Sequence, residues 1–323
     1  MRAIQIAEPG GPEALAITEV DRPEPASGEV LIEVAAAGVN FIDTYQREGL
    51  YPVDFPFVPG LECSGTVVEL GEGVTGLSAG DRVAVGAGAG SYAEFRVAPA
   101  ARCVVIPDGV SFEQAAASMV QALTAHYLAF DTYPLGKGDR CLIHAAAGGT
   151  GRLLVQMAKA AGAEVFATVS SAEKEELALS AGADHVIIYT EVDFADEIRA
   201  ITDTERPLDV VYDGVGASVF TKSLGLLRVR GLMATFGNAS GPVDPVAPLD
   251  LMVGGSLFLT RPTLGDYIAT TEELQARANA VFKMISSGAL DIRIDTEFSL
   301  EDAAASHQHL EGRKSNGKLL LKP

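Results

Sequence analysis

The sequence has no tryptophan, only three cysteines and few basic residues. Against 43 Asp and Glu residues stand 24 Lys and Arg residues, so the formal net charge is −19. Nucleic-acid phosphates and anionic membrane surfaces both select basic protein surfaces, so this charge argues against either partner. The cysteines Cys63, Cys103 and Cys141 are too scattered for a disulfide framework or a zinc-binding Cys-x-x-Cys pair. A reducing cytoplasm is the expected location.

Long apolar runs are also missing. Glycines and charges interrupt every hydrophobic stretch before it reaches the length of a membrane-spanning helix. The first 15 residues lack the apolar core of a signal peptide. A hydrophobic content of 48% over 323 residues nevertheless allows a large core and predicts about two domains.

The first third of the chain is strand-like. Short β-branched segments alternate there with Gly, Pro and Asp. They predict a compact, partly closed barrel with one short helix at 41–48. The expected strands cover residues 3–6, 29–39, 63–70, 81–85 and 93–98.

After Pro107 the pattern changes to helices and strands in alternation. Ser111 is placed to cap the first helix, and strand-helix units then follow one another to about residue 235. Such alternation predicts a parallel sheet with right-handed crossovers. From about Thr263 we expect two helices and a final strand that returns to the first domain. The sequence thus predicts an α/β protein with a β-rich domain (1–120 and 263–323), a doubly wound domain (121–262) and an active cleft between them.

The segment "HAAAGGTG" at 144–151 joins the first strand of this series to a helix. Gly148 and Gly151 occupy the second and third positions of the Gly-x-Gly-x-x-Gly fingerprint, while Ala146 replaces the first glycine. The helix N-terminus offers free N–H groups and a positive dipole end to a pyrophosphate. A tight turn without a ligand is the alternative, but the position at the first strand-helix junction favours nucleotide binding.

The end of the second strand bears on which nucleotide binds. NAD sites usually carry an acidic residue about 20 residues further on, bonded to the ribose 2′-hydroxyl. This chain has Ser170 and Ser171 there, followed by Lys174, and Tyr189 ends the third strand. Glu173 weakens the argument slightly, and a solvated surface charge is the ordinary role of one lysine. The missing acid and the nearby base together predict NADPH.

Several blocks in order along the chain resemble the zinc-independent quinone oxidoreductases of the medium-chain dehydrogenase/reductase superfamily, the zeta-crystallin-like branch. They are "GVNFIDTYQREGLYP", "GLECSG", "AGDRV", "FEQAAASMVQALTAHYL", "HAAAGGTG", "VVYDGVG", "RGLMATFGNASG" and "LTRPTL". The resemblance implies a GroES-like catalytic domain, a Rossmann domain, NADPH-dependent reduction of quinones and a homodimer. Two departures are Thr150, where the family commonly has Val, and "LEC" at 61–63, where close relatives have Thr-Glu-Ala.

The resemblance also implies a set of cofactor contacts. Phe236, Gly237 and Asn238 would lie against the nicotinamide ribose or carboxamide, and Arg313 would reach the 2′-phosphate. The other implied contacts are Asn40, Thr124, Gly148, Gly149, Ser171, Lys174 and Tyr189. Thr150, which opens the helix, is a further expected cofactor contact, because a threonine there should not disturb the phosphate contact.

No metal site is expected. In the zinc alcohol dehydrogenases that share this architecture, a Cys would stand at Asn40 and a His at Leu61. Glu62 alone cannot hold zinc, and the three cysteines cannot build a four-cysteine lobe. The five histidines are too separated, or wrongly spaced on a helix, to act together.

Without a metal, the reaction must suit an acceptor that takes a hydride readily, as quinones do. Our candidates for the catalytic lining are Asn40, Asp43, Tyr45 and Tyr51. A tyrosine could hydrogen-bond a quinone carbonyl, and Asn40 could orient the carboxamide or the substrate. Simple packing is as plausible for Tyr45, and a helix first-turn charge for Asp43, so Asn40 and Tyr51 are the stronger candidates.

Two other functions stay open at this point. One is reduction of activated alkenes such as enones or enoyl thioesters, which uses the same hydride geometry but needs a proton donor. The other is a nucleotide-binding protein with a structural or RNA-binding role, which the net charge disfavours. For assembly, the apolar stretch at 248–261 is expected at a sheet edge, where it could pair with a second copy or be buried within the chain.

Overall fold

The computed structural model describes residues 1–312 and 314–323. These residues form two compact units, one of Met1–Leu123 with Tyr267–Pro323 and one of Thr124–Asp266. The boundaries expected from the sequence lie a few residues before these. Each unit builds its own hydrophobic core.

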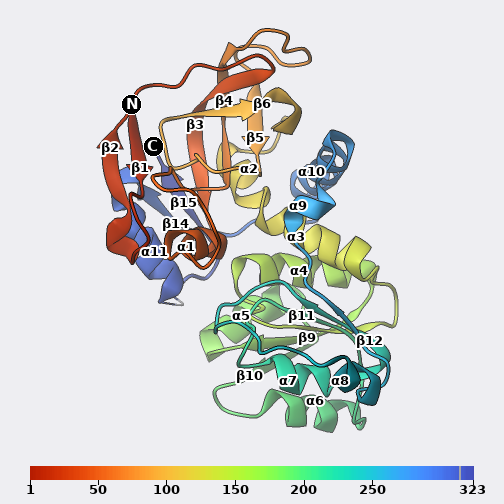
Figure 1. Cartoon of the computed structure of the whole chain (residues 1–323). Coiled ribbons are helices and arrows are strands. Elements are labelled where there is room, and N and C mark those ends of the chain that lie inside the picture. Colours follow the sequence, from red (N-terminus) through yellow and green to blue (C-terminus); the bar gives the residue numbers. More distant parts are fainter. Residues whose placement is uncertain (313) are drawn as a thin grey trace. The chain divides into compact units, whose positions relative to one another are not determined.

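The first unit is built mainly of strands (Figure 1). Its strands are β1 (Arg2–Gln5), β2 (Ala16–Glu19), β3 (Glu29–Val39), β4 (Glu62–Leu70), β5 (Arg82–Val85), β6 (Phe95–Pro99), β7 (Cys103–Val105), β14 (Ile294–Ser299) and β15 (Lys318–Lys322). The main sheet runs β14-β15-β3-β4-β5-β7, with β6 also paired to β3, and β1 and β2 form a separate antiparallel pair. Within the described residues this path ends at β14 and β7, so the expected barrel is open.

Strand β3 is the centre of this unit. Val30, Ile32 and Val34 point into the core, and the last residues of β3 pair with β15 from the C-terminus. The final strand therefore returns to the first domain, as expected. A Cβ at Gly38 would lie 2.3 Å from Oε1 of Glu62, so glycine is what lets the Glu62 carboxylate lie against β3.

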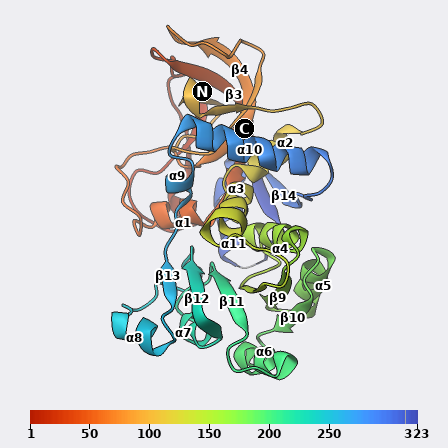
Figure 2. The same ribbon diagram turned by 90° about the vertical axis from the view of Figure 1, so that its right-hand side faces the viewer.

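Four helices described in this unit are α1 (Phe41–Arg47), α2 (Phe112–Ser118), α10 (Thr271–Ser286) and α11 (Ala303–Glu311). Ser111 caps α2 as predicted, because its hydroxyl accepts a hydrogen bond of 3.1 Å from the N–H of Gln114. Helix α10 lies beside α2 (Figure 2). Helix α11 packs on β15 and contacts α1, which joins the C-terminal segment to the helix that carries the expected catalytic residues.

The C-terminal segment holds more structure than the two helices and one strand that we expected. A short helix α9 (Leu264–Tyr267) precedes α10, and β14 pairs in parallel with β15. Strand β14 is a half-buried edge strand with polar residues on both faces, so its alternation is weak. Strands β2 and β7 were also not predicted: β2 is mostly exposed and has no buried face, and β7 is only three residues long.

The second unit has the expected alternation. Its strands are β8 (Arg140–Ile143), β9 (Glu164–Val169), β10 (His185–Ile188), β11 (Leu208–Asp213), β12 (Leu227–Thr235) and β13 (Phe258–Thr260). Its helices include α4 (Gly149–Ala161), α5 (Ala172–Ser180), α6 (Phe194–Thr202), α7 (Phe220–Leu224) and α8 (Pro248–Val253), while α3 (Gln121–Tyr127) contains the boundary between the units.

All strands of this sheet are parallel, in the order β10-β9-β8-β11-β12-β13. Helix α4 covers one face, and α6 and α7 cover the other (Figure 1). This is the strand order of the doubly wound dinucleotide-binding fold. The predicted fold class is confirmed. Among the described helices, none is both long and apolar enough to cross a membrane.

Candidate functional site

The order of the parallel sheet reverses between β8 and β11. In such sheets ligands bind at the carboxyl ends of the strands, next to this reversal. The glycine turn follows β8, and the other predicted cofactor contacts in this unit, except Thr124, follow β9, β10 and β12. The structure therefore brings most of these predicted residues to one edge of one sheet.

The glycine turn begins helix α4 as expected. Gly148 is the N-cap, and Gly149 and Thr150 are the first two helical residues, so their N–H groups lie at the positive end of the helix dipole. A Cβ at Gly151 would lie 2.3 Å from the carbonyl oxygen of Ala145. The third glycine is therefore required for close packing of helix against strand, which is the role that the fingerprint assigns to it.

The missing first glycine of the fingerprint does not strain Ala146, the residue that replaces it. Ala146 keeps an ordinary negative φ, while its neighbour Ala145 has φ +51°. A left-handed alanine costs about 1 kcal/mol or more, so the turn is held by its surroundings. One support is His144, whose ring nitrogens lie 2.8 Å from the hydroxyls of Thr168 and Ser223. Burial lowers the pKa of His144 to about 3, so the imidazole is neutral and structural.

The residues that we expect to determine whether NADPH or NADH binds lie at the ends of β9 and β10. Ser171 is the N-cap of α5 and accepts a hydrogen bond from the N–H of Lys174. The N–H of Tyr189 bonds the carbonyl of Val169 at 3.0 Å, so Tyr189 stands beside the end of β9, and it is 41% exposed. No acidic side chain follows β9 directly, and the first turn of α5 carries Lys174 between Glu173 and Glu175.

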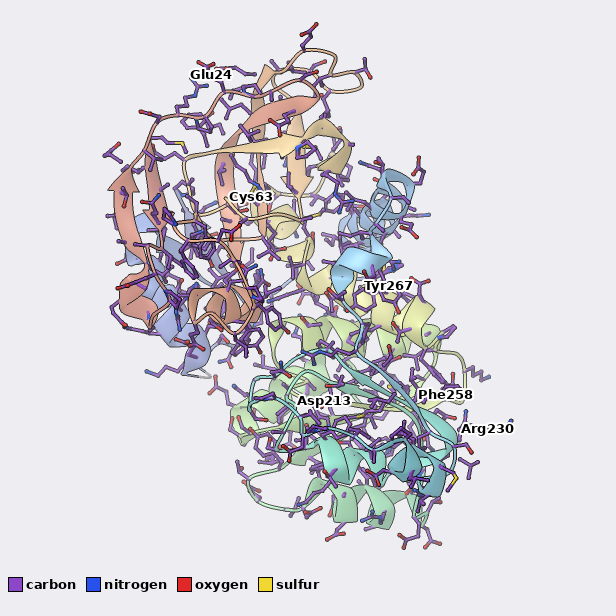
Figure 3. All side chains as sticks on the ribbon, viewed as in Figure 1. Glu24, Cys63, Asp213, Arg230, Phe258 and Tyr267 are labelled. Carbon is purple, nitrogen blue, oxygen red and sulfur yellow. The ribbon has the colours of Figure 1, made fainter. Side chains whose placement is uncertain are left out.

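The ends of β11 and β12 lie close together. The carboxylate of Asp213, at the end of β11 (Figure 3), accepts bonds of 2.7 and 2.9 Å from the N–H groups of Val215 and Gly216. A Cβ at Gly237 would lie 2.3 Å from the carbonyl oxygen of Gly214. The predicted contacts 236–238 are thus held in a fixed loop against the loop that follows β11.

Arg261, which follows β13, is a residue of this edge that our sequence analysis did not single out. Its Nη1 donates to the carbonyl oxygen of Gly237 at 2.9 Å and to the Thr235 hydroxyl at 3.3 Å. Its other terminal nitrogen lies 3.3 Å from the side-chain oxygen of Asn238. Arg261 thereby places a positive charge beside the loop expected to hold the nicotinamide. It lies in the block "LTRPTL", which could have drawn attention to it.

Thr124 lies on α3, at the start of this unit, and is largely buried. Arg313 lies outside the described residues.

In the first unit, Asn40 is part of a buried polar cluster. Its side-chain N–H groups donate to Glu62 Oε1 at 2.8 Å and to the carbonyl oxygen of Gly38 at 3.4 Å. Its amide oxygen accepts from Nζ of Lys318 at 2.7 Å, and Lys318 also pairs with Glu62. The amide of Asn40 is thus largely occupied by internal partners, which leaves it little capacity to orient a carboxamide or a substrate.

Helix α1 brings the other catalytic candidates together. Asp43 accepts a bond of 2.8 Å from the N–H of Asn40, which fixes the first turn of the helix. The rings of Tyr45 and Tyr51 meet edge to face, with centroids 5.3 Å apart, and the N–H of Tyr51 bonds the carbonyl of Tyr45. Both tyrosines are half-buried, which suits a substrate lining, while Asp43 is fully buried.

A second set of residues, unforeseen from the sequence, surrounds Asp43. The Tyr92 hydroxyl donates to Asp43 at 3.0 Å and lies 3.2 Å from Nε2 of His307. Nδ1 of His307 lies 3.0 Å from Nη1 of Arg47, and Arg47 pairs with Glu311. Burial raises the pKa of Asp43 to about 7, against the opposing hydrogen bonds from Asn40 and Tyr92.

The residues at the expected position of a catalytic zinc do not fit that metal. Asn40 and Leu61 stand where zinc enzymes have a thiolate and an imidazole, and the ammonium group of Lys318 lies against Asn40 and Glu62. A lysine ammonium has no lone pair to give and repels a cation. Within the described part of the chain, no group of three or more His, Cys, Asp or Glu side chains could hold a metal ion.

The fold and the strand-end site define a two-domain dehydrogenase or reductase, and comparison with known proteins agrees. A family model described as an alcohol dehydrogenase GroES-like domain matches residues 26–108, and one described as a zinc-binding dehydrogenase matches residues 149–283. A quinone oxidoreductase of Pseudomonas aeruginosa is 44% identical over 324 residues, which cover 100% of this chain and 99% of that protein. A 2-haloacrylate reductase of a Burkholderia species is 39% identical, over 99% and 98% of the two chains.

Solved structures give the same result. The quinone oxidoreductase of Escherichia coli complexed with NADPH has a TM-score of 0.97 at 41% identity, with 100% of both chains covered. A mycobacterial protein complexed with NADPH has a TM-score of 0.96 at 46% identity, again over 100% of both chains. The chain belongs to the quinone oxidoreductase family of the medium-chain dehydrogenases/reductases, as its sequence motifs predicted.

Proposed function

We propose that this protein reduces quinones with NADPH and without a metal ion. The observation that carries the proposal is the carboxyl edge of the parallel sheet. There the α4 N-terminus can receive a pyrophosphate, and Ser171 and Lys174 stand where an NAD site usually has an acid. The NADPH complexes of the two solved relatives support the cofactor, and the quinone oxidoreductase relatives support the substrate.

The chain's own residues have distinct tasks in this proposal. When bound, NADPH supplies a hydride. Gly148, Gly149 and Thr150 hold the pyrophosphate, and the loop at 236–238 with Arg261 holds the nicotinamide end. Tyr45 and Tyr51 receive the quinone, whose reduction is driven by aromatisation and needs orientation more than Lewis acidity. The Asn40–Lys318–Glu62 cluster supports a reaction without a metal ion, because the ammonium group of Lys318 lies against the residues at the expected zinc position.

The choice of nucleotide is testable at Lys174. We expect Lys174→Ala to weaken NADPH binding roughly tenfold, because one charge-assisted contact to the 2′-phosphate is lost. NADH binding should not change, since NADH has no phosphate there. Fluorescence titration with both nucleotides measures the effect.

Lys137→Ala is the matched control, because Lys137 is exposed and precedes the amino end of β8, at the opposite edge of the same sheet. It should leave both affinities unchanged. If the wild type binds NADH as tightly as NADPH, the argument from Ser171 and Lys174 is wrong.

A second candidate activity is reduction of activated alkenes. It is favoured by the 2-haloacrylate reductase relative, which matches nearly the full length of this chain. Steady-state rates with 1,2- and 1,4-quinones against alkenals and haloacrylates distinguish the two activities. Higher kcat/KM values for the alkenes would reject the quinone proposal.

We further propose that two copies of the chain associate through the β13 edge of the sheet. Apolar side chains are exposed along this edge and on the helix before it, among them Phe258 (59% exposed, Figure 3), Leu249, Met252 and Val253. An exposed apolar strand edge favours pairing with a symmetry-related copy.

Phe258→Lys should shift the wild-type dimer towards monomer, because a charge on the edge strand opposes pairing of two identical edges. Sedimentation velocity measures the shift. Ile201→Lys is a control, because Ile201 is an exposed apolar residue (41%) on α6. A monomeric wild type would refute the proposed dimer.

The cytoplasm is the proposed location. Cys63, Cys103 and Cys141 are all unpaired, buried thiols, which is typical of proteins that fold in a reducing compartment.

A further inference from the structure

His144, the first residue after β8, lies at the centre of a buried chain of hydrogen bonds next to the glycine turn. Its Nδ1 lies 2.8 Å from the hydroxyl oxygen of Thr168 on β9, and its Nε2 lies 2.8 Å from the hydroxyl oxygen of Ser223 on α7. The Ser223 hydroxyl lies 2.8 Å from the carbonyl oxygen of Val219. The three side-chain partners belong to residues that are at most 2% exposed. The chain therefore links β8, β9 and α7 in the interior of this unit.

One arrangement of hydrogens gives every donor in this chain an acceptor. The Ser223 hydroxyl donates to the carbonyl of Val219, so the Ser223 oxygen accepts from Nε2–H of His144. Nδ1 then carries no hydrogen and accepts from the Thr168 hydroxyl. The opposite tautomer would leave the Thr168 hydroxyl hydrogen without an acceptor among the described residues. Burial lowers the pKa of His144 to about 3, so the ring stays neutral and keeps this arrangement.

Thr168 holds both neighbours of the left-handed residue Ala145. Its hydroxyl donates to the ring of His144, and its carbonyl oxygen accepts from the N–H of Ala146 at 3.1 Å. On the other side of β8, the N–H of His144 donates to the carbonyl of Tyr212 in β11 at 3.1 Å. Ala145 has φ +51°, a conformation that alanine avoids. Because it is fixed on both sides, it cannot return to a negative φ without breaking these bonds.

Ala145 in turn places the N-terminus of α4. Its carbonyl oxygen accepts from the N–H of Gly148, the N-cap, at 2.9 Å. The same oxygen lies so close to Gly151 that a Cβ there would be 2.3 Å away. Residues 148–150 are partly exposed, whereas His144 is buried. A ligand at this end of α4 can therefore contact the turn but not the imidazole.

We propose that His144 is a positioning residue for the cofactor. The imidazole holds Ala145 in its left-handed conformation, and this conformation places the first N–H groups of α4 for the pyrophosphate of NADPH. Thr168 and Ser223 fix the tautomer and the orientation of the ring. The fingerprint glycines allow helix and strand to approach closely, but they do not hold the strained residue before them. The inference rests on the proposed function and adds the group that maintains its pyrophosphate site.

The tautomer can be tested without a ligand. In protein with ¹⁵N-labelled histidine, long-range ¹H–¹⁵N NMR spectra distinguish a protonated from an unprotonated ring nitrogen, and His144→Gln identifies the His144 signals. We expect a hydrogen on Nε2 only, and no titration of this ring between about pH 5 and 8, where an ordinary histidine titrates. A hydrogen on Nδ1, or a midpoint near the ordinary value of about 6.5, would overturn the inference.

Thr168→Val tests the effect on the cofactor. Valine keeps the shape of threonine but cannot donate to Nδ1 of His144, so NADPH should bind about tenfold more weakly in isothermal titration. Thr168→Ser retains the hydroxyl and should bind NADPH as the wild type does. Adenosine 2′-monophosphate is a second probe, because it carries the 2′-phosphate but no pyrophosphate. Its affinity, measured by NMR titration, should not change in Thr168→Val, whereas general damage to this unit would weaken the binding of both ligands.

Ser223→Ala removes the acceptor of Nε2–H and should also weaken NADPH binding about tenfold. Ser306→Ala is the matched control, because Ser306 is an equally buried helical serine whose hydroxyl donates to the carbonyl of Ala303 at 2.7 Å. It loses a similar bond to the backbone and should leave NADPH affinity unchanged. Wild-type NADPH affinity in either Thr168→Val or Ser223→Ala overturns the inference, as does an equal loss of adenosine 2′-monophosphate binding.

Ala145→Gly tests the strain directly. Glycine adopts a positive φ without cost, so the turn should no longer depend on the imidazole. The double variant Ala145→Gly/Thr168→Val should therefore recover most of the NADPH affinity that Thr168→Val loses. A double variant that binds NADPH as weakly as Thr168→Val overturns the inference alone. A wild type that does not bind NADPH refutes the proposed function and, with it, this inference.

Discussion

We expect Lys318→Met to lower the free energy of unfolding by about 3–5 kcal/mol, the typical loss when one partner of a buried ion pair is removed. Lys318 pairs with Glu62, and the two side chains are 1% and 0% exposed. Methionine keeps much of the lysine length but not its charge. Glu62 then keeps a buried negative charge, and the amide oxygen of Asn40 loses its donor. Urea denaturation followed by circular dichroism measures the loss.

Lys322→Met provides a control in the same strand. Lys322 also pairs with a glutamate, Glu113, but these side chains are 34% and 32% exposed. An exposed ion pair contributes about 1 kcal/mol or less, so this variant should be nearly as stable as the wild type. The double variant Lys318→Met/Glu62→Gln removes the isolated charge and should recover much of the loss. Equal losses in Lys318→Met and Lys322→Met would contradict the explanation.

The parts of this protein that could be predicted from its sequence depend on local patterns. Strand-helix alternation specified the parallel sheet, and the glycines at 148 and 151 marked the turn before α4. Ser111 was recognisable as a cap because the capping partner lies only three residues away. Each of these features is decided within a few residues, which is the range over which sequence periodicity and turn chemistry act.

The support of the candidate catalytic residues could not be predicted in this way. Lys318 meets Asn40 across 278 positions of sequence, and Arg47 meets His307 across 260. The sequence gives no sign that Lys318 or His307 is buried. Lysine is usually exposed, histidine is found both inside and outside, and a lysine is buried only where it has a partner. Only the return of β15 to β3, and of α11 to α1, places these pairs together. Asn40 was therefore predicted as a cofactor contact, and its largely internal bonding was missed.

The glycine turn shows a second kind of limit. The sequence shows that the first glycine is absent but not where the strain falls. The structure places the left-handed residue at Ala145, one position before the fingerprint position. Gly151 is necessary because α4 approaches Ala145 closely. This closeness is a property of the backbone conformation and cannot be seen in the residue types of the motif.

Among glycine-to-alanine substitutions at this turn, we expect Gly151→Ala to weaken cofactor binding most. Its Cβ would lie 2.3 Å from the carbonyl oxygen of Ala145 and 3.0 Å from Cα of Ala146, both backbone atoms that cannot move alone. The N-terminus of α4 must therefore shift away from the strand. We expect a loss of about 1–3 kcal/mol in unfolding free energy, as for other overpacked sites. NADPH binding should weaken about tenfold or more, because the N–H groups that face the pyrophosphate move with the helix.

Gly265→Ala separates this clash from a general effect of replacing glycine. Gly265 lies in α9, at a position where a Cβ would meet no atom within 4 Å. Alanine there should leave NADPH binding unchanged and should keep or slightly raise the unfolding free energy, because it restricts the unfolded chain. Isothermal titration with NADPH and urea denaturation of both variants make the comparison. Wild-type NADPH affinity in Gly151→Ala would show that α4 can shift without cost, and that the turn does not hold the pyrophosphate.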